Sequence, residues 1–192
     1  MKTFSQISPY QSTIRKAVHI SGVGLHSGDR IKMTLSPAGA NTGIRFVRKD
    51  LDTNNTVPAF MNRVVDTTMA TTISEGNASI ATTEHLLAAI NGLSIDNILI
   101  EVDGPEVPIM DGSSAPFVNL LLDAGIRQQK SYRRLVKITR EISFSDSDRH
   151  ISIYPYDGFK VTAEINFTHD TINRQVYSVA VTPRKFVAEI SR

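Results

Sequence analysis

The sequence predicts an α+β fold made of two consecutive α/β sandwich units, each a mixed sheet with helices, of which the second is incomplete. Along the 192 residues, short segments with the apolar patterning of strands lead into a helix-like segment, and this order occurs twice. A polar and basic stretch at residues 126–134 lies between the two runs and is the best candidate for a linker. The domains are therefore expected at residues 1–126 and 127–192.

The composition is that of an ordinary globular chain, with 41% apolar and 21% charged residues. The formal net charge is only +2 at pH 7, so no nucleic acid or other polyanion is expected as a partner. Cysteine is absent, which excludes disulfides and thiolate metal sites. No apolar run approaches the roughly 20 residues that cross a bilayer, and the N-terminus lacks the apolar core of a signal peptide. We therefore expect a cytoplasmic protein that does not span a membrane.

Strands of the first unit are predicted from two kinds of apolar pattern. Residues 30–35 alternate between apolar and polar side chains, as in a half-buried strand. Residues 97–102 are almost continuously apolar, as expected of a strand covered on both faces. The remaining short strands are expected at residues 13–20, 43–47, 69–73 and 78–80.

Two helices are predicted in the first unit. The hydroxyls of Thr82 and Thr83 can cap a helix that begins with the next residue, and Gly92 offers a left-handed stop for it. A second helix is expected between Pro116 and Gly125, because proline is favoured just inside a helix start and glycine just past its end.

The second unit is predicted to contain strands followed by one helix. That helix spans residues 184–190, opens with Thr182 as cap and Pro183 at its first position, and has one apolar face that must pack. No second helix and no capping glycine follow, so we expect the chain to be truncated relative to a complete fold; a frayed natural C-terminus is the alternative. The strands are expected at residues 135–139, 141–144, 150–154, 159–167 and 177–181.

The most informative pair of side chains is Glu84 and His85, in the first turn of the first helix. The positive N-terminus of a helix favours an ionised carboxylate and a neutral imidazole. These are the forms that accept a proton and bind zinc. Adjacent Glu and His are common, however, and on these two residues alone a surface helix end is the favoured interpretation. No His-x-x-His, His-x-x-x-His or His-x-x-x-Asp pair occurs, so spacing identifies no second ligand.

Three further motifs carry weaker signals. Residues 22–28 look superficially like a phosphate loop, but they lack the dinucleotide spacing and lead into a strand, so a turn is favoured. Residues 111–113 are either a polar site loop or a tight turn that caps the next helix. Phe167, close to His169, could stack on a nucleobase, but a core strand position is the favoured interpretation.

Several segments together resemble the UDP-3-O-acyl-N-acetylglucosamine deacetylase family, zinc hydrolases that commit bacteria to the synthesis of lipid A, the lipid part of lipopolysaccharide. The resemblance runs from about Ser12 to Arg192 and fits two α+β sandwiches that face each other across an active site. The segments are GVGLHSG (22–28), PAGANTG (37–43), TEHLLAA (83–89), GLSIDN (92–97), EVPIMDGSSAPF (106–117) and LLLDAGI (120–126).

The resemblance implies a role for four residues. Glu84 corresponds to the general base and His85 to the first zinc ligand. His26 corresponds to a position that lines the active-site region, and Phe167 to an aromatic at the nucleotide end of the substrate site. In the family, zinc and the glutamate activate a water that attacks the 2-acetamido carbonyl of the acylated UDP-sugar, and acetate leaves. A complete member is expected to be monomeric.

The same resemblance implies that parts of the metal centre are missing. The family's other two zinc ligands form a His-x-x-x-Asp pair, and the general-acid histidine follows later; both would lie beyond Arg192. One ligand of three should hold Zn²⁺ weakly or not at all, so the chain is expected to be inactive alone. The alternatives are a short non-catalytic product that binds the acylated UDP-sugar or a partner, and an unrelated α+β scaffold protein.

Overall fold

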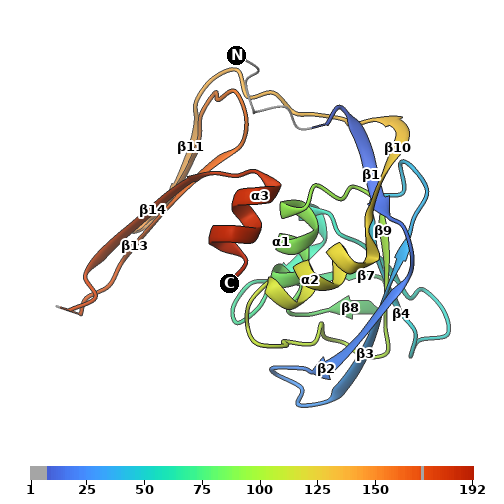
Figure 1. Cartoon of the computed structure of the whole chain (residues 1–192). Coiled ribbons are helices and arrows are strands. Elements are labelled where there is room, and N and C mark those ends of the chain that lie inside the picture. Colours follow the sequence, from blue (N-terminus) through green and yellow to red (C-terminus); the bar gives the residue numbers. More distant parts are fainter. Residues whose placement is uncertain (1–7, 170) are drawn as a thin grey trace.

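The α+β fold is confirmed by the computed structural model, which describes residues 8–169 and 171–192 (Figure 1). The first unit is built on a five-stranded mixed sheet with the order β2-β3-β9-β4-β5, in which only β4 and β9 run parallel. These strands are β2 (Val18–Val23), β3 (Arg30–Pro37), β9 (Ile98–Val102), β4 (Ile44–Arg48) and β5 (Thr56–Pro58).

The strands predicted from the two apolar patterns are present in this sheet as β3 and β9. In β3 the alternate residues Ile31, Met33 and Leu35 are buried. The strand β9 lies between β3 and β4, with Ile98 and Ile100 fully buried and the other face half-buried. Since neither face of β9 is fully exposed, the nearly continuous apolar run matches its surroundings.

A smaller three-stranded sheet and two helices complete the first unit. The sheet has the order β6-β7-β8. Helix α1 (Glu84–Gly92) packs on helix α2 (Ala115–Ala124), and both bury apolar residues in the core. As predicted, α2 carries a proline near its start and is followed by Gly125 in a left-handed conformation (φ 70°). The short elements are η1 (Met61–Arg63), β6 (Val64–Asp66), β7 (Thr72–Glu75) and β8 (Ala78–Ile80).

Both predicted ends of α1 differ from the structure. The Thr83 hydroxyl does not cap the helix but donates to the carbonyl of Thr71 (2.9 Å). Gly92 is not a left-handed stop but the last helical residue, and the left-handed position falls on Ser94 (φ 58°). The reason for glycine at position 92 is close packing, because a Cβ there would overlap the ring of Phe186.

The segment expected to be a linker is a strand for most of its length. Strand β10 (Ile126–Tyr132) pairs antiparallel with β1 (Tyr10–Ile14), which attaches it to the first unit. Irregular backbone follows at residues 133–139, where a strand was predicted from 135 onward. The division at residues 1–126 and 127–192 stays a prediction.

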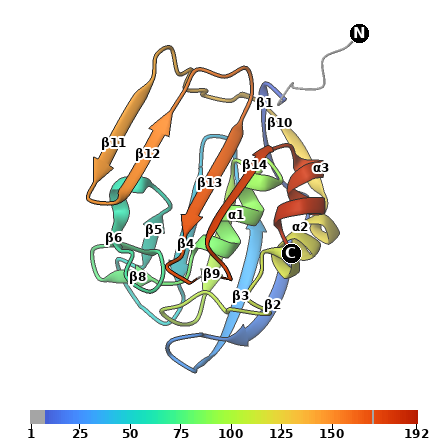
Figure 2. The ribbon, with the colours of Figure 1, turned by 90° about the vertical axis from the view of Figure 1, so that its left-hand side faces the viewer.

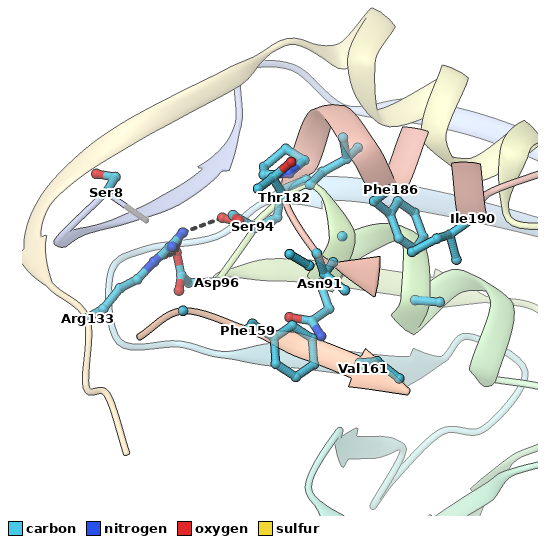
Figure 3. A pocket seen from close by; sticks show the side chains of 18 of the residues that line it. Ser8, Asn91, Ser94, Asp96, Arg133, Phe159, Val161, Thr182, Phe186 and Ile190 are labelled. Atoms are coloured by element: carbon cyan, nitrogen blue, oxygen red, sulfur yellow. Dashed lines mark hydrogen bonds and ion pairs between the residues drawn. The ribbon is translucent and has the colours of Figure 1, made fainter. Parts of the chain in front are cut away.

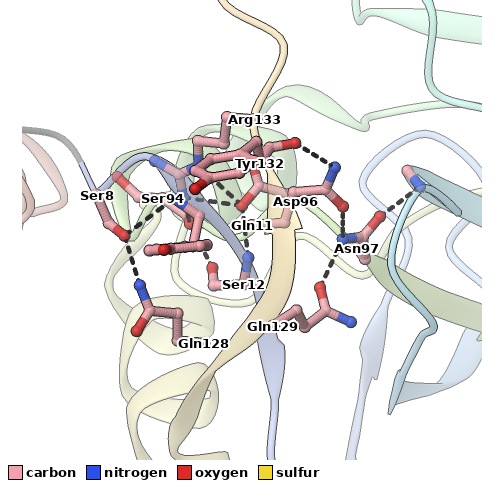
Figure 4. Close-up of polar contacts among 12 residues, drawn as sticks. Ser8, Gln11, Ser12, Ser94, Asp96, Asn97, Gln128, Gln129, Tyr132 and Arg133 are labelled. Carbon is pink, nitrogen blue, oxygen red and sulfur yellow. Dashed lines mark hydrogen bonds and ion pairs between the residues drawn. The ribbon is translucent and has the colours of Figure 1, made fainter.

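One polar side chain of β10, that of the half-buried Gln129, takes part in a hydrogen-bond network inside the protein (Figure 4). The amide nitrogen of Asn97 donates to Gln129 Oε1 (2.7 Å) and Gln11 Oε1 (2.8 Å). The oxygen of the same Asn97 side chain accepts from the backbone amide of Gly43 (2.8 Å). A buried amide network of this kind stabilises a strand pair that composition alone assigns to solvent.

A second polar contact fixes the point where the chain leaves β10. The nearly buried Arg133 guanidinium pairs with Asp96 (2.8 Å) and donates to the carbonyl of Ser94. Asp96 also accepts from the amide of Ser12 in β1 (2.7 Å). The start of the second unit is therefore tied to the loop between α1 and β9 (Figure 4).

The second unit consists of two separate hairpins and a C-terminal helical segment. The hairpins are formed by β11 (Ile142–Asp146) with β12 (Arg149–Ile153), and by β13 (Lys160–Asn166) with β14 (Arg174–Ala180). They stand beside the first unit, with the C-terminal segment between them and α1 (Figures 1 and 2).

The C-terminal segment begins as predicted but continues differently. Thr182 accepts from the amide of Lys185 (3.2 Å) and caps the short α3 (Pro183–Lys185), which continues as a π-helical turn, η2 (Phe186–Ile190). Phe186 is buried, and its neighbours on the same face pack against the core of the first unit. The apolar face therefore packs as predicted, and it packs on the core of the first unit, against α1.

A cavity of about 1080 Å³ lies between the two units (Figure 3). Its walls come from the C-terminal half of α1, at Asn91 and Gly92, from Val161 and Tyr177 of the second hairpin, and from Phe186. Among the described residues, no helix has the length and apolar character needed to cross a membrane.

Candidate functional site

The backbone that enters α1 is held in an unusual conformation. Thr82 has a φ of 57°, which is unfavourable for a β-branched residue. Its predecessor Ala81 is clamped on both sides, donating to the carbonyl of Pro105 (2.8 Å) and accepting from the amide of Val107 (3.0 Å). The orientation of the first turn of α1 is therefore set by hydrogen bonds to the segment at residues 105–107 and not by a side-chain cap.

Glu84 is the first residue of α1 and is half-buried. Its Oε2 accepts a hydrogen bond from the amide of Thr71 (2.9 Å), and the same threonine accepts from the Thr83 hydroxyl. The carboxylate is thus oriented by the loop before β7 while it keeps contact with solvent.

His85 is half-buried as well, and its main chain links the two helices. Its carbonyl accepts from the hydroxyl of Ser114, the residue before α2 (3.0 Å). Residues 111–113 form the predicted tight turn that leads into α2, since Ser113 donates to Asp111 through its hydroxyl (2.8 Å) and amide (2.9 Å). These bonds lower the pKa of the Asp111 carboxyl.

The other two predicted site residues lie on different elements. His26 is exposed on the turn between β2 and β3, as predicted for this glycine-rich segment. Phe167 follows β13 and is 44% exposed, so the favoured interpretation of a core strand residue is wrong. The turn between β13 and β14 points away from α1 in Figure 1.

One acidic residue that the sequence did not single out joins the His26 turn to α1. Glu106 is only 2% exposed and accepts from the amides of His26 (3.1 Å) and Ser27 (3.0 Å) and from the hydroxyl of Thr82 (2.9 Å). Burial alone would raise the pKa of Glu106, but these hydrogen bonds outweigh burial and lower it. The only sequence signal is a single acid inside the otherwise apolar run after Pro105.

Comparison with known proteins identifies the family of this chain. A model of the UDP-3-O-acyl N-acetylglycosamine deacetylase (LpxC) family matches residues 11–192. The chain belongs to this family. UDP-3-O-acyl-N-acetylglucosamine deacetylase from Pasteurella multocida is 44% identical over 95% of this chain and 61% of the relative. The deacetylase of Anaeromyxobacter sp. is 46% identical over 95% of this chain and 59% of the relative. The chain thus spans about 60% of the length of these curated relatives.

Within this member of the LpxC family, the described residues do not assemble a complete metal centre. No group of three or more His, Cys, Asp or Glu side chains in residues 8–169 and 171–192 is placed to hold a metal. A catalytic zinc usually takes about three protein ligands, so His85 is a single candidate ligand here. The large cavity is not this site either, since neither Glu84 nor His85 is among its lining residues.

Proposed function

We propose that this chain takes part in the hydrolysis of the 2-acetamido group of UDP-3-O-acyl-N-acetylglucosamine, with Glu84 as general base and His85 as one ligand of a catalytic zinc. The observation that carries the proposal is the adjacent, half-buried Glu84 and His85 at the start of α1, with the carboxylate oriented by the amide of Thr71.

Two more residues are proposed to contact the substrate. His26 is exposed on a turn that Glu106 holds next to Thr82, two residues before Glu84. Phe167, exposed after β13, has an accessible ring that could stack on a uracil base. The proposal also includes a cytoplasmic location, which rests on the sequence pattern, and a monomeric complete enzyme, which rests on the family resemblance.

When bound, zinc would polarise the acetamido carbonyl and lower the pKa of a water. This chain's own contribution is to orient a base through Thr71 and to present one imidazole. We therefore propose that the chain by itself is inactive and nearly free of zinc. Metal analysis and acetate release measured on the purified chain test this directly. Stoichiometric zinc together with acetate release would overturn it.

The role of Glu84 is tested in a chimaera that joins this chain to the part of the P. multocida deacetylase that it does not cover. Glu84→Gln should lower kcat about 10²- to 10⁴-fold, as for a lost general base. KM should change less than about threefold, because a base acts on the reaction barrier and not on ground-state binding.

The matched control is Glu141→Gln, which removes an exposed carboxylate whose contact is with Ser143 (3.0 Å) and should leave kcat unchanged. Equal losses in kcat and in binding for Glu84→Gln would argue against the role of a base. Calorimetric binding of the acylated UDP-sugar to the chain alone, without acetate release, would instead support the non-catalytic binding role.

A further inference from the structure

Glu106 collects hydrogen bonds from two segments that lie far apart in the sequence. One of its oxygens, Oε1, accepts from the amide of His26 (3.1 Å) and from the hydroxyl of Thr82 (2.9 Å). The other oxygen, Oε2, accepts from the amide (3.0 Å) and the hydroxyl (2.9 Å) of Ser27. A buried carboxylate is tolerated only when it is satisfied in this way, and charge-assisted bonds are the strong ones.

The turn that carries His26 is built around this carboxylate. Gly24 accepts from the amide of Gly28 (3.0 Å) and donates to the carbonyl of Asp29 (2.9 Å), which closes the turn. A Cβ on Gly24 would overlap both Ser27 Oγ and Glu106 Oε2. The turn therefore has the tight shape that brings its amides onto Glu106.

On the other side, the carboxylate meets the strained residue before α1. Thr82 holds a positive φ that its side chain disfavours, and its hydroxyl is bonded to Glu106. Strained backbone of this kind persists only where the surroundings over-determine it, and it clusters at functional sites. Glu84 follows two residues later. A change of the Thr82 backbone to a more favourable φ would therefore alter the orientation of the first turn of α1.

We propose that Glu106 is a positioning residue that holds the His26 turn and the start of α1 in one fixed arrangement, so that His26 stays in place relative to Glu84 and His85. Its importance for chemistry rests on the proposed function, but the coupling itself does not. Glutamine cannot replace Glu106, because its side-chain amide has only one acceptor oxygen. Its NH₂ group would face the N–H and O–H donors that now bind the second carboxylate oxygen.

The coupling is tested by amide hydrogen exchange, followed by NMR on the whole chain. Glu106→Gln should accelerate exchange at least tenfold at His26 and Ser27, and also at Thr71, whose amide binds Glu84. The amide of Lys49, bonded to the carbonyl of Val102 (2.7 Å), should change less than twofold. A general loss of stability would accelerate Lys49 together with the others and would overturn the proposal.

A second variant covers the case in which Glu106→Gln does not fold. Thr82→Val removes only the hydroxyl on the α1 side, yet it should accelerate exchange at His26 severalfold through the shared carboxylate. An effect confined to the start of α1 would overturn the coupling. The control Glu75→Gln removes a half-buried carboxylate paired with Arg63 (2.8 Å) and should leave His26 unchanged.

In the chimaera described above, Glu106→Gln should lower kcat at least tenfold. A chimaera that is inactive with Glu106 in place would reject the proposed function, while the exchange pattern would still decide the coupling. Unchanged exchange at His26 and Thr71 in Glu106→Gln would reject the positioning role whatever the activity.

Discussion

The two units contain similar apolar strand patterns but bury them to very different degrees. In the first unit, Phe117 of α2 is fully buried and helices α1 and α2 share one core with the sheet. In the second unit, Phe144 of β11 is 68% exposed. Periodicity therefore identifies a strand and its apolar face, but not whether that face is covered by other parts of the protein.

The second unit contacts the first unit mainly near its two ends, at the segment after β10 and at the C-terminal helical segment. Each hairpin has two strands and is not joined to the other in one sheet, and an isolated two-stranded hairpin is marginal in water. Its attachments to the first unit include the Arg133–Asp96 pair and the packing of Phe186 and its apolar neighbours on the core around α1. Stability should therefore be concentrated in the first unit, with the hairpins contributing little.

The largest expected effect comes from truncating the same residue type in each unit. Phe117→Ala should lower the free energy of unfolding by about 3–5 kcal/mol, because it leaves a cavity in a closed core. Phe144→Ala should change it by less than about 0.5 kcal/mol, since the ring is mostly in water. Urea unfolding at low protein concentration measures both. A large loss in Phe144→Ala would mean that the hairpin face is covered in solution.

Much of the first unit could be predicted from its sequence because local signals agreed with packing. The alternation in β3, the continuous run in β9 and the proline and glycine that bound α2 all correspond to observed elements. The linker interpretation of β10 was wrong because the strand pairs with β1 and its Gln129 bonds to Asn97, contacts between distant parts of the sequence that no local pattern reveals.

The two glycines Gly92 and Gly39 provide a second, smaller test of how the units are joined. Alanine in a helix is favoured over glycine by about 1 kcal/mol, so Gly92→Ala would stabilise a free α1. Here its Cβ overlaps Phe186, and the net effect should be a loss of about 1–2 kcal/mol. At Gly39 the nearest atom is Thr42 Oγ1 at 3.6 Å, so Gly39→Ala should be close to neutral.

A double-variant cycle by urea unfolding decides whether Phe186 causes the loss. In a Phe186→Ala background the overlap is gone, and Gly92→Ala should become neutral or stabilising. If Gly92→Ala still lowers the free energy of unfolding in this background, the cause lies within α1. Close packing of Gly92 on Phe186 would then not explain the glycine.

Only the part of the candidate site that is formed by adjacent residues in the sequence could be predicted. Glu84 and His85 lie side by side, and their position at a helix start follows from the sequence pattern. Glu106 went unnoticed because its partners, His26 and Thr82, meet it only through the tertiary fold. Phe167 was placed in a core for lack of any signal that its strand ends before it.

The smallest expected effect compares an ion pair from each unit as the pH falls. Asp50 is bonded to the nearly buried Arg48 (2.6 and 2.8 Å), and this contact lowers the pKa of the carboxyl. A carboxyl with a lowered pKa stabilises the fold above its unfolded value of about 3.9, and that stability is lost as the pH falls through the folded pKa. Asp50→Asn should therefore remove less than about 1 kcal/mol at pH 7, because the pair is partly exposed, and progressively less as the pH falls through the folded pKa.

Glu164 provides the control from the second unit. Its pKa is also lowered, by Arg174, but both side chains are open to solvent on a hairpin face. Glu164→Gln should therefore leave the urea midpoint unchanged between pH 7 and pH 3, because solvent screens the pair and the hairpin does not limit unfolding. A pH-dependent loss as large as that of Asp50→Asn would show that the β13–β14 hairpin unfolds together with the first unit, and the contrast in stability between the two units would be wrong.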